Sequence, residues 1–374
     1  MPEKTPKLSP DEPKHDSAQA GTDSPSQEVA AHERPVDEEP TPQPPLDWMD
    51  KTLQWGVRVK PGKKGLTVDS LNVGIYGEVP EFWEEQTRMP RGAYPAGGVP
   101  PIGYSLRYKH EMWADNAAGL YEEAVQRRWI PATDVPWDTI PSQPDDVQAA
   151  MAQICTELSQ QANVEIESIG YWMPQMSYGY HEVKLYLATE LMDAARHLEV
   201  FRKRALINGG GLGLESSGGV NRMILESRGG WSETSLFLHL LRGTFTMTLY
   251  RYGEAYATNP ADKYIFGRCL QDKSRHLAYG LNHLRYAITH AQDKALIFQR
   301  LLAVGEAVLA RDLNDPVLSE ALAVVMGGGL EGAQVGMGRV RQLMGDFVGQ
   351  YLRYAEQLGI SREQSLSGGL ARFF

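Results

Sequence analysis

One short signature occurs twice in this 374-residue chain, on two stretches that both have the pattern of long helices. Apolar residues recur at helical spacing through Leu185–Phe201 and again through Tyr264–Tyr286. In each copy an Asp and a His are four residues apart, so the two side chains share one helix face. The copies read Asp193-Ala194-Ala195-Arg196-His197-Leu198 and Asp272-Lys273-Ser274-Arg275-His276-Leu277.

This repeated pattern resembles the Asp-Glu-x-Arg-His motif of the ferritin-like diiron carboxylate oxygenases and oxidoreductases, in a bacterial branch of that superfamily. There, two helices of a four-helix bundle carry the motif, whose Glu and His bind iron, and each of the other two helices gives one Glu. The likeness covers roughly residues 106–355, including Trp129–Trp137 ahead of the bundle. It implies an all-α fold with a ferritin-like four-helix bundle core, additional helices and an N-terminal arm.

The ligand pattern of the superfamily is eroded in this chain. Ala194 and Lys273 stand where the motif has its two Glu residues. Antiparallel helices place residues equidistant from their turn at one level, and counting back from His197 across the first hairpin reaches Glu165. Counting back from Lys273 and His276 across the second arrives near Arg242, Gly243 and Thr246, where no acid stands. Of the metal ligands that the resemblance implies, three remain: Glu165, His197 and His276. The resemblance also implies that Asp193 and Asp272 orient the two histidines.

This loss of carboxylates changes the chemistry that we expect. Two iron ions need several anionic oxygens to balance and bridge them, so a full diiron centre is not expected. The expected cofactor is either none or a single iron or manganese ion. Lys273, with help from Arg242, is predicted to form an ion pair with Glu165 in place of the metal. This predicted site resembles that of some metal-free ribonucleotide reductase small subunits, which have a Lys where a metal-binding carboxylate would be.

Three interpretations of the two signature histidines stay open. They can be core side chains that donate hydrogen bonds to the aspartates, or they can join Glu165 around a single ferrous ion with open positions for oxygen. A dinuclear site completed by other acids is the third. Arg196 and Arg275 are expected to brace the bundle through ion pairs, and His181 and His239 are interpreted as structural. The other acids considered are Glu167, Glu190 and Glu226.

Composition limits the remaining classes of protein. With 42% hydrophobic and 22% charged residues the chain is globular, and no run of eighteen apolar residues predicts a membrane span. A net charge of −10 argues against general nucleic-acid binding. Cys155 and Cys269 are the two cysteines, which excludes a disulfide framework and favours a reducing, cytoplasmic location.

The chain divides into three zones by composition. Residues 1–46 are acidic and Pro-rich and are predicted to be a disordered tail. Residues 47–104 are rich in Trp, Pro and Gly and are predicted to be an extended arm that wraps the bundle or a neighbouring subunit, with short strands such as Leu66–Val73. Residues 105–374 form the predicted ferritin-like helical domain. Its glycine-rich stretch 208–219 is interpreted as a crossover, since it lacks the Gly-Lys-Ser/Thr ending of a phosphate loop.

Two functional classes are compatible with these residues. The first is a degenerate ferritin-like protein, a non-catalytic or altered-function subunit that forms a homodimer or pairs with a metal-competent paralogue, with room for an apolar small molecule between its helices. The second is an O2-dependent oxidoreductase of the monooxygenase or N-oxygenase type with a mononuclear or altered site. Ala194 and Lys273 favour the first class, whereas the retained ligands keep the second open, so whether the protein is an enzyme is undecided.

Overall fold

The computed structural model describes residues 43–51, 57–84, 90–94 and 97–373. It consists of two units that divide between Leu53 and Gln54. The described residues of the first unit contain one short 3-10 helix, Asp47–Lys51. Most of the predicted tail, residues 1–42, lies outside the described residues.

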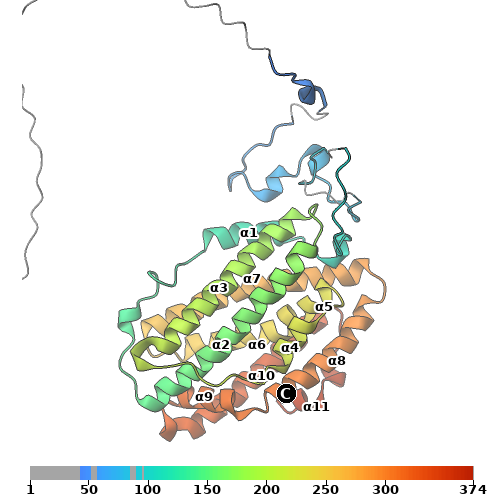
Figure 1. Ribbon diagram of the computed structural model, residues 1–374. Helices are drawn as coiled ribbons and strands as arrows, with labels where there is room; N and C mark the ends of the chain where they lie inside the picture. Colours follow the sequence, from blue (N-terminus) through green and yellow to red (C-terminus); the bar gives the residue numbers. More distant parts are fainter. Residues whose placement is uncertain (1–42, 52–56, 85–89, 95–96, 374) are drawn as a thin grey trace, which may run out of the picture. The chain divides into compact units, whose positions relative to one another are not determined.

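The described part of the second unit is all-helical, and it contains no β-strand beyond three isolated bridges. Its α-helices are α1 (Ala117–Gln126), α2 (Asp145–Trp172), α3 (His181–Leu206), α4 (Gly219–Glu226), α5 (Trp231–Ser235), α6 (Gly243–Ala255), α7 (Pro260–His290), α8 (Lys294–Asp312), α9 (Pro316–Gly327), α10 (Ala333–Gln357) and α11 (Gly368–Ala371) (Figure 1). A π-helical segment, Leu236–Arg242, joins α5 to α6. Short 3-10 turns lie at Val68–Leu71, Gly74–Tyr76, Lys109–Glu111, Trp137–Thr139, Met173–Gln175, Ile207–Gly209, Leu330–Gly332 and Glu363–Ser365.

Two helical hairpins form the bundle: α2 packs against α3, and α6 packs against α7 (Figure 1). Asp145 and Asp146 lie in the first turn of α2, where negative charge is favourable. Helix α7 begins at Pro260, and the Asn259 side chain caps it by accepting a hydrogen bond from the Asp262 backbone N–H at 2.8 Å. The all-α, ferritin-like bundle expected from the sequence is confirmed.

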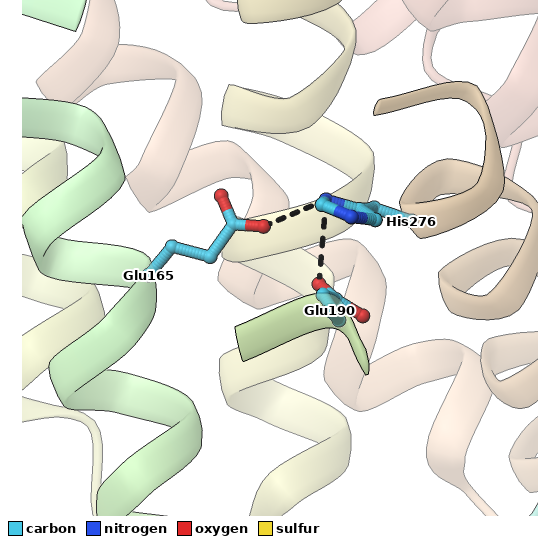
Figure 2. A group of neighbouring side chains, drawn as sticks. All are labelled: Glu165, Glu190 and His276. Atoms are coloured by element: carbon cyan, nitrogen blue, oxygen red, sulfur yellow. Dashed lines mark ion pairs between the residues drawn. The ribbon is translucent and has the colours of Figure 1, made fainter. Parts of the chain in front are cut away.

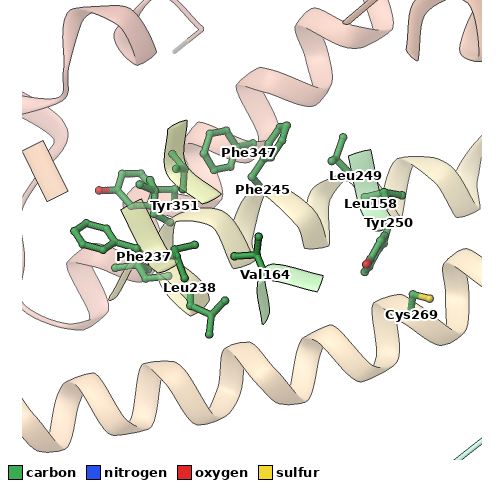
Figure 3. Packing of buried hydrophobic residues seen from close by; sticks show 14 of the residues in the cluster. Leu158, Val164, Phe237, Leu238, Phe245, Leu249, Tyr250, Cys269, Phe347 and Tyr351 are labelled. Atoms are coloured by element: carbon green, nitrogen blue, oxygen red, sulfur yellow. The ribbon is translucent and has the colours of Figure 1, made fainter. Parts of the chain in front are cut away.

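The C-terminal helices cover one flank of the bundle. Helix α9 packs on α2, and α10 packs on α6 and α9. Figure 3 shows this core, in which Phe245 of α6 meets Phe347 of α10 with their ring centroids 5.3 Å apart. Tyr250 of α6 lies on the α7 side of the same core and is 2% exposed. Burial of these large side chains supplies much of the apolar surface that holds the layers together.

The described residues of the arm contact the helical domain at several points. The buried Arg91 guanidinium forms an ion pair with Glu182 at the start of α3 and donates to the Gly179 carbonyl at 2.7 Å. The Val68 N–H donates to Glu122 of α1 at 2.9 Å. The predicted strand at Leu66–Val73 is wrong: a 3-10 turn lies there, closed by local hydrogen bonds such as Ser70 Oγ to the Thr67 carbonyl.

The glycine-rich stretch links α3 to α4 along the side of α2. Gly213 N–H donates to Thr156 Oγ1 at 2.7 Å, and Leu214 N–H donates to Gln153 Oε1 at 2.7 Å. It thus connects the two hairpins, as a crossover does. In the part of the chain that the structure describes, no helix is long and apolar enough to cross a membrane.

Candidate functional site

A cluster of four ionisable side chains lies buried at the centre of the bundle: Glu165, Glu190, Lys273 and His276 (the central cluster). Lys273 Nζ of α7 forms an ion pair with Glu165 Oε2 of α2. His276 Nδ1 lies 2.8 Å from Glu165 Oε1 and 3.8 Å from Glu190 Oε1 of α3. Figure 2 shows the two glutamates approaching the His276 ring from different helices. Three helices therefore contribute charge to one enclosed point.

Arg242 adds a second cation to this point. Its Nη2 lies 3.8 Å from Glu165 Oε2, while its Nη1 donates to Asn221 Oδ1 at 2.8 Å. Lys273 and Arg242 thus both face the carboxylate of Glu165, and the ion pair expected from the sequence is present.

The Asp and Arg that both copies of the signature share form a neighbouring paired-aspartate layer: Asp193, Arg196, Asp272 and Arg275. Contacts cross between the two helices in a symmetric way. His276 Nε2 of α7 lies 3.2 Å from Asp193 Oδ2, and His197 Nε2 of α3 lies 3.2 Å from Asp272 Oδ2. Because an ionised carboxylate only accepts, both histidines donate through Nε2.

The two arginines close this layer. Arg196 donates to Asp193 and, at 3.3 Å, to Asp272. Arg275 donates to Asp272 and, at 3.0 Å, to Asp193. Each aspartate therefore pairs with both arginines, which fits the bracing role expected for Arg196 and Arg275.

His239, interpreted from the sequence as structural, reaches the central cluster through Glu190. Its Nε2 lies 2.8 Å from Glu190 Oε1, and its Nδ1 lies 2.7 Å from Ser235 Oγ. The reason is the π-helical segment Leu236–Arg242, whose wider turn changes which residues face the bundle. Gly280 of α7 permits this approach, since a Cβ there would lie 2.2 Å from His239 Cβ.

Charges and burial set the protonation states. Burial raises the pKa of Glu165, but the charges of Lys273 and His276 outweigh it and hold that pKa well below its usual value. For His276, burial lowers the pKa, yet Glu190 and Glu165 raise it to about 9, so this ring is a cation at neutral pH. For His197, burial dominates over Asp272 and lowers the pKa, so this ring is neutral.

The residues present do not fit a dinuclear metal centre. Ala194 offers no ligand atom, and the Glu165 carboxylate already faces two cations. Around the centre, four buried acids face four buried Lys and Arg side chains before His276 adds its charge: Glu165, Glu190, Asp193 and Asp272 against Lys273, Arg242, Arg196 and Arg275. Two divalent ions would add an uncompensated positive charge that a low-dielectric interior tolerates poorly.

Part of the central cluster fits a single metal ion better than it fits two. Glu165, Glu190 and His276 each offer a ligand atom, and these atoms lie within 4.8 Å of one another. Among the described residues, Glu165 Oε1, Glu190 Oε2 and His276 Nδ1 have no hydrogen-bond partner of good geometry. The 2.8 Å contact between Nδ1 and Oε1 is therefore an electrostatic contact rather than a well-directed hydrogen bond.

The structure groups the sequence-derived ligands differently from the proposed trio. Glu165 and His276 lie together, while His197 faces Asp272 and stacks near His276 with ring centroids 6.1 Å apart. Glu190, one of the acids considered as an alternative, is the carboxylate that joins them. It sits one turn before Ala194 on the same face of α3, a spacing that could have identified it.

These features define the class of fold. Two hairpins of long helices, with two Asp-x-x-Arg-His faces turned toward each other, form a ferritin-like helical bundle. No family model matches the sequence, and no curated protein matches it.

Among solved structures, the chain is similar to a point mutant of an R2-like ligand-binding oxidase with an aerobically reconstituted Mn/Fe cofactor. The TM-score is 0.51 at 16% sequence identity, and the match covers 65% of this chain and 93% of that chain. At this identity the similarity shows the ferritin-like fold.

Proposed function

We propose that this protein is a ferritin-like subunit that works without a dinuclear metal centre, in a non-catalytic or altered role. The observation that carries the proposal is the buried ion pair between Lys273 and Glu165. It places an ammonium group against the carboxylate that a metal would need. The pair then holds the hairpins α2–α3 and α6–α7 together, which is the structural part of a metal's role.

Such a subunit would assemble with itself or with a metal-competent ferritin-like paralogue in the cytoplasm. The paired-aspartate layer supports the ferritin-like bundle of such a subunit, since its ion pairs join α3 to α7 within the chain. Purification of the tagged chain from its native cells, followed by mass measurement of the intact complex, tests the assembly. A strictly monomeric protein at micromolar concentration would contradict it.

The metal content of the protein is the direct test. We would produce the full chain in medium supplemented with iron and manganese and measure the bound metal by elemental analysis. The proposal expects far less than one metal per chain, because Lys273 and protonated His276 repel a cation. About two metals per chain would overturn it.

Replacement of the lysine sharpens this test. Lys273→Glu restores an acid at the motif position and should raise affinity for Mn²⁺ or Fe²⁺ by at least about tenfold. Lys263→Glu is the matched control, because Lys263 lies on the same helix but is exposed. Equal metal binding by the two variants would show that Lys273 does not oppose a metal.

One observation favours a second candidate, an O2-dependent oxidoreductase with a single metal. It is the proximity of ligand atoms from Glu165, Glu190 and His276, of which Glu165 Oε1 and His276 Nδ1 have no hydrogen-bond partner of good geometry among the described residues. A single ferrous ion held there would supply oxygen activation, while the protein would position the ion and exclude water. About one metal per wild-type chain, lost in Glu190→Gln, would support this candidate over the first.

A further inference from the structure

A cavity of about 230 Å³ opens between the first half of α2, the end of α6, the start of α7 and α9. Most of the lining is apolar, and we call six of these side chains the inner wall: Met151, Ile154, Leu249, Phe266, Leu322 and Val325. This cavity lies apart from the central cluster, since it contains none of that cluster's residues.

Three polar residues of the cavity, Gln143, Tyr252 and Asp262, already have partners within the protein. Asp262 is the one charged residue among the described residues that line it, and Arg204 and Asn259 bind its carboxylate. The Tyr252 hydroxyl donates to Asp346 at 2.7 Å, and Gln143 Oε1 accepts from Arg204 at 3.3 Å. No unpaired charge from the described lining residues is therefore offered to an occupant.

The absence of an unpaired charge among these lining residues favours a neutral molecule in the cavity. A charged molecule would lose its hydration in the cavity without gaining an opposite charge, which is costly. A neutral apolar molecule would instead remove the apolar wall from water at about 25 cal/mol per Å² of buried surface.

The volume of the cavity limits the size of the molecule that can bind in it. An apolar cavity of about 150 Å³ in another protein stays free of water and binds benzene. A cavity of about 230 Å³ has room for a molecule one ring larger, or for a short hydrocarbon chain of equal volume.

We propose that this cavity is a binding site for a neutral, mainly apolar small molecule of about two-ring size. Its inner wall adjoins the aromatic layer of the bundle: the Phe266 ring lies 5.7 Å from Phe201 and 6.4 Å from Tyr250, centroid to centroid. Tyr250 in turn lies edge-on to His197 at 5.7 Å. Occupation of the cavity thus stabilises the packing beside the paired-aspartate layer. The proposal stands independently of any role for metal.

Naphthalene is the probe that tests the proposal, and 1-naphthoate is its charged counterpart. Thermal unfolding of the full chain with saturating naphthalene should show a Tm rise of at least about 2 °C, because a ligand that binds the folded state stabilises it. The carboxylate of 1-naphthoate should abolish most of that rise. Absence of any naphthalene shift, or an equal shift with 1-naphthoate, would overturn the proposal.

Two variants locate the site. Val325→Phe fills the cavity from α9, and Thr258→Trp covers its rim from an exposed position that leaves the core packing intact. Both should lose the naphthalene shift. Val304→Phe is the control, because it adds the same ring at an exposed position of α8 outside the cavity and should keep the shift. If Val325→Phe fails to fold, Thr258→Trp decides alone, and a wild-type shift there would refute this location.

Discussion

The paired-aspartate layer and the central cluster share the signature helices α3 and α7, and α2 adds Glu165 to the cluster alone. The carboxylates of the two regions differ in their hydrogen bonds. In the layer, both oxygens of Asp193 and both oxygens of Asp272 accept hydrogen bonds. In the central cluster, Glu165 Oε1 and Glu190 Oε2 lack a well-directed hydrogen bond among the described residues. All carboxylate oxygens of the layer are therefore hydrogen-bonded, whereas one oxygen of each glutamate in the cluster is not, within the described residues.

Symmetry separates the two regions as well. In the layer, α3 and α7 exchange equivalent contacts, His197 with Asp272 and His276 with Asp193. In the cluster, α7 contributes Lys273 where α3 has Ala194, so the two helices are no longer equivalent. The two signature helices are thus equivalent in the layer and differ in the cluster.

The largest expected effect comes from breaking the layer. Asp272 accepts from Trp129, Arg196, His197 and Arg275. Asp272→Asn removes the negative charge and leaves buried cations uncompensated, so we expect a loss of at least about 4 kcal/mol in unfolding free energy. Chemical denaturation measures it. Asp138→Asn, at an exposed site, should change stability by less than about 0.5 kcal/mol.

Breaking the central cluster should cost somewhat less, because Arg242 remains beside Glu165. Lys273→Met should lower the unfolding free energy by about 3 kcal/mol through the unpaired buried carboxylate. Adding Glu165→Gln should restore part of this loss. A double variant as unstable as the sum of the two single variants would show that the two side chains do not interact.

The pH dependence of stability should distinguish the cluster from the layer. Folding raises the pKa of His276 from 6.5 to about 9, so its contribution is complete below pH 6.5 and is lost as pH rises through 9. Wild-type protein prepared without added metal should lose about 3 kcal/mol relative to His276→Gln between these values. A difference between the two proteins that is constant with pH would show that His276 is not charged in the folded state.

Much of the architecture could be predicted from the sequence because it depends on periodicity and capping. Helical spacing, Asn259-Pro260 and the twofold Asp-x-x-Arg-His pattern together indicate α2, α3 and α7 and their pairing. Equal distances to a hairpin turn lead from His197 to Glu165, while Lys273 as its partner follows from the resemblance, because it stands at a Glu position of the motif. Helical periodicity and helix capping depend on residues near one another in the sequence, and both apply along the long uninterrupted helices of this chain.

The position of His239 in the site depends on a local departure from α-helical geometry. The π-helical segment Leu236–Arg242 alters the register of the third bundle helix, and the residues before it give no periodic signal of that change. His239 reaches Glu190 for this reason. Helix counting could place Arg242 near Glu165, but it could not place His239 in the same cluster.

A smaller effect should reveal how tightly the π-helical segment packs. Gly280→Ala adds a Cβ 2.2 Å from His239 Cβ, an atom near the backbone that cannot swing away, so we expect a loss of about 2 kcal/mol. Gly267→Ala on the same helix meets only the flexible end of Glu254 and should be neutral or stabilising. Equal stabilities would contradict the close approach of α7 to this segment.

The smallest expected effect isolates one hydrogen bond to the layer. The Trp129 indole donates to the ionised Asp272 carboxylate at 2.9 Å, while the Trp137 indole donates to the neutral Pro131 carbonyl at 2.8 Å. Hydrogen bonds to charged groups contribute about 1 kcal/mol more than neutral ones. Trp129→Phe should therefore destabilise the protein by about 1 kcal/mol more than Trp137→Phe in chemical denaturation. If Asp272 is already satisfied by its arginines and His197, the two variants will be equally stable, and the layer will not need the helix-flanking tryptophan to hold its charge.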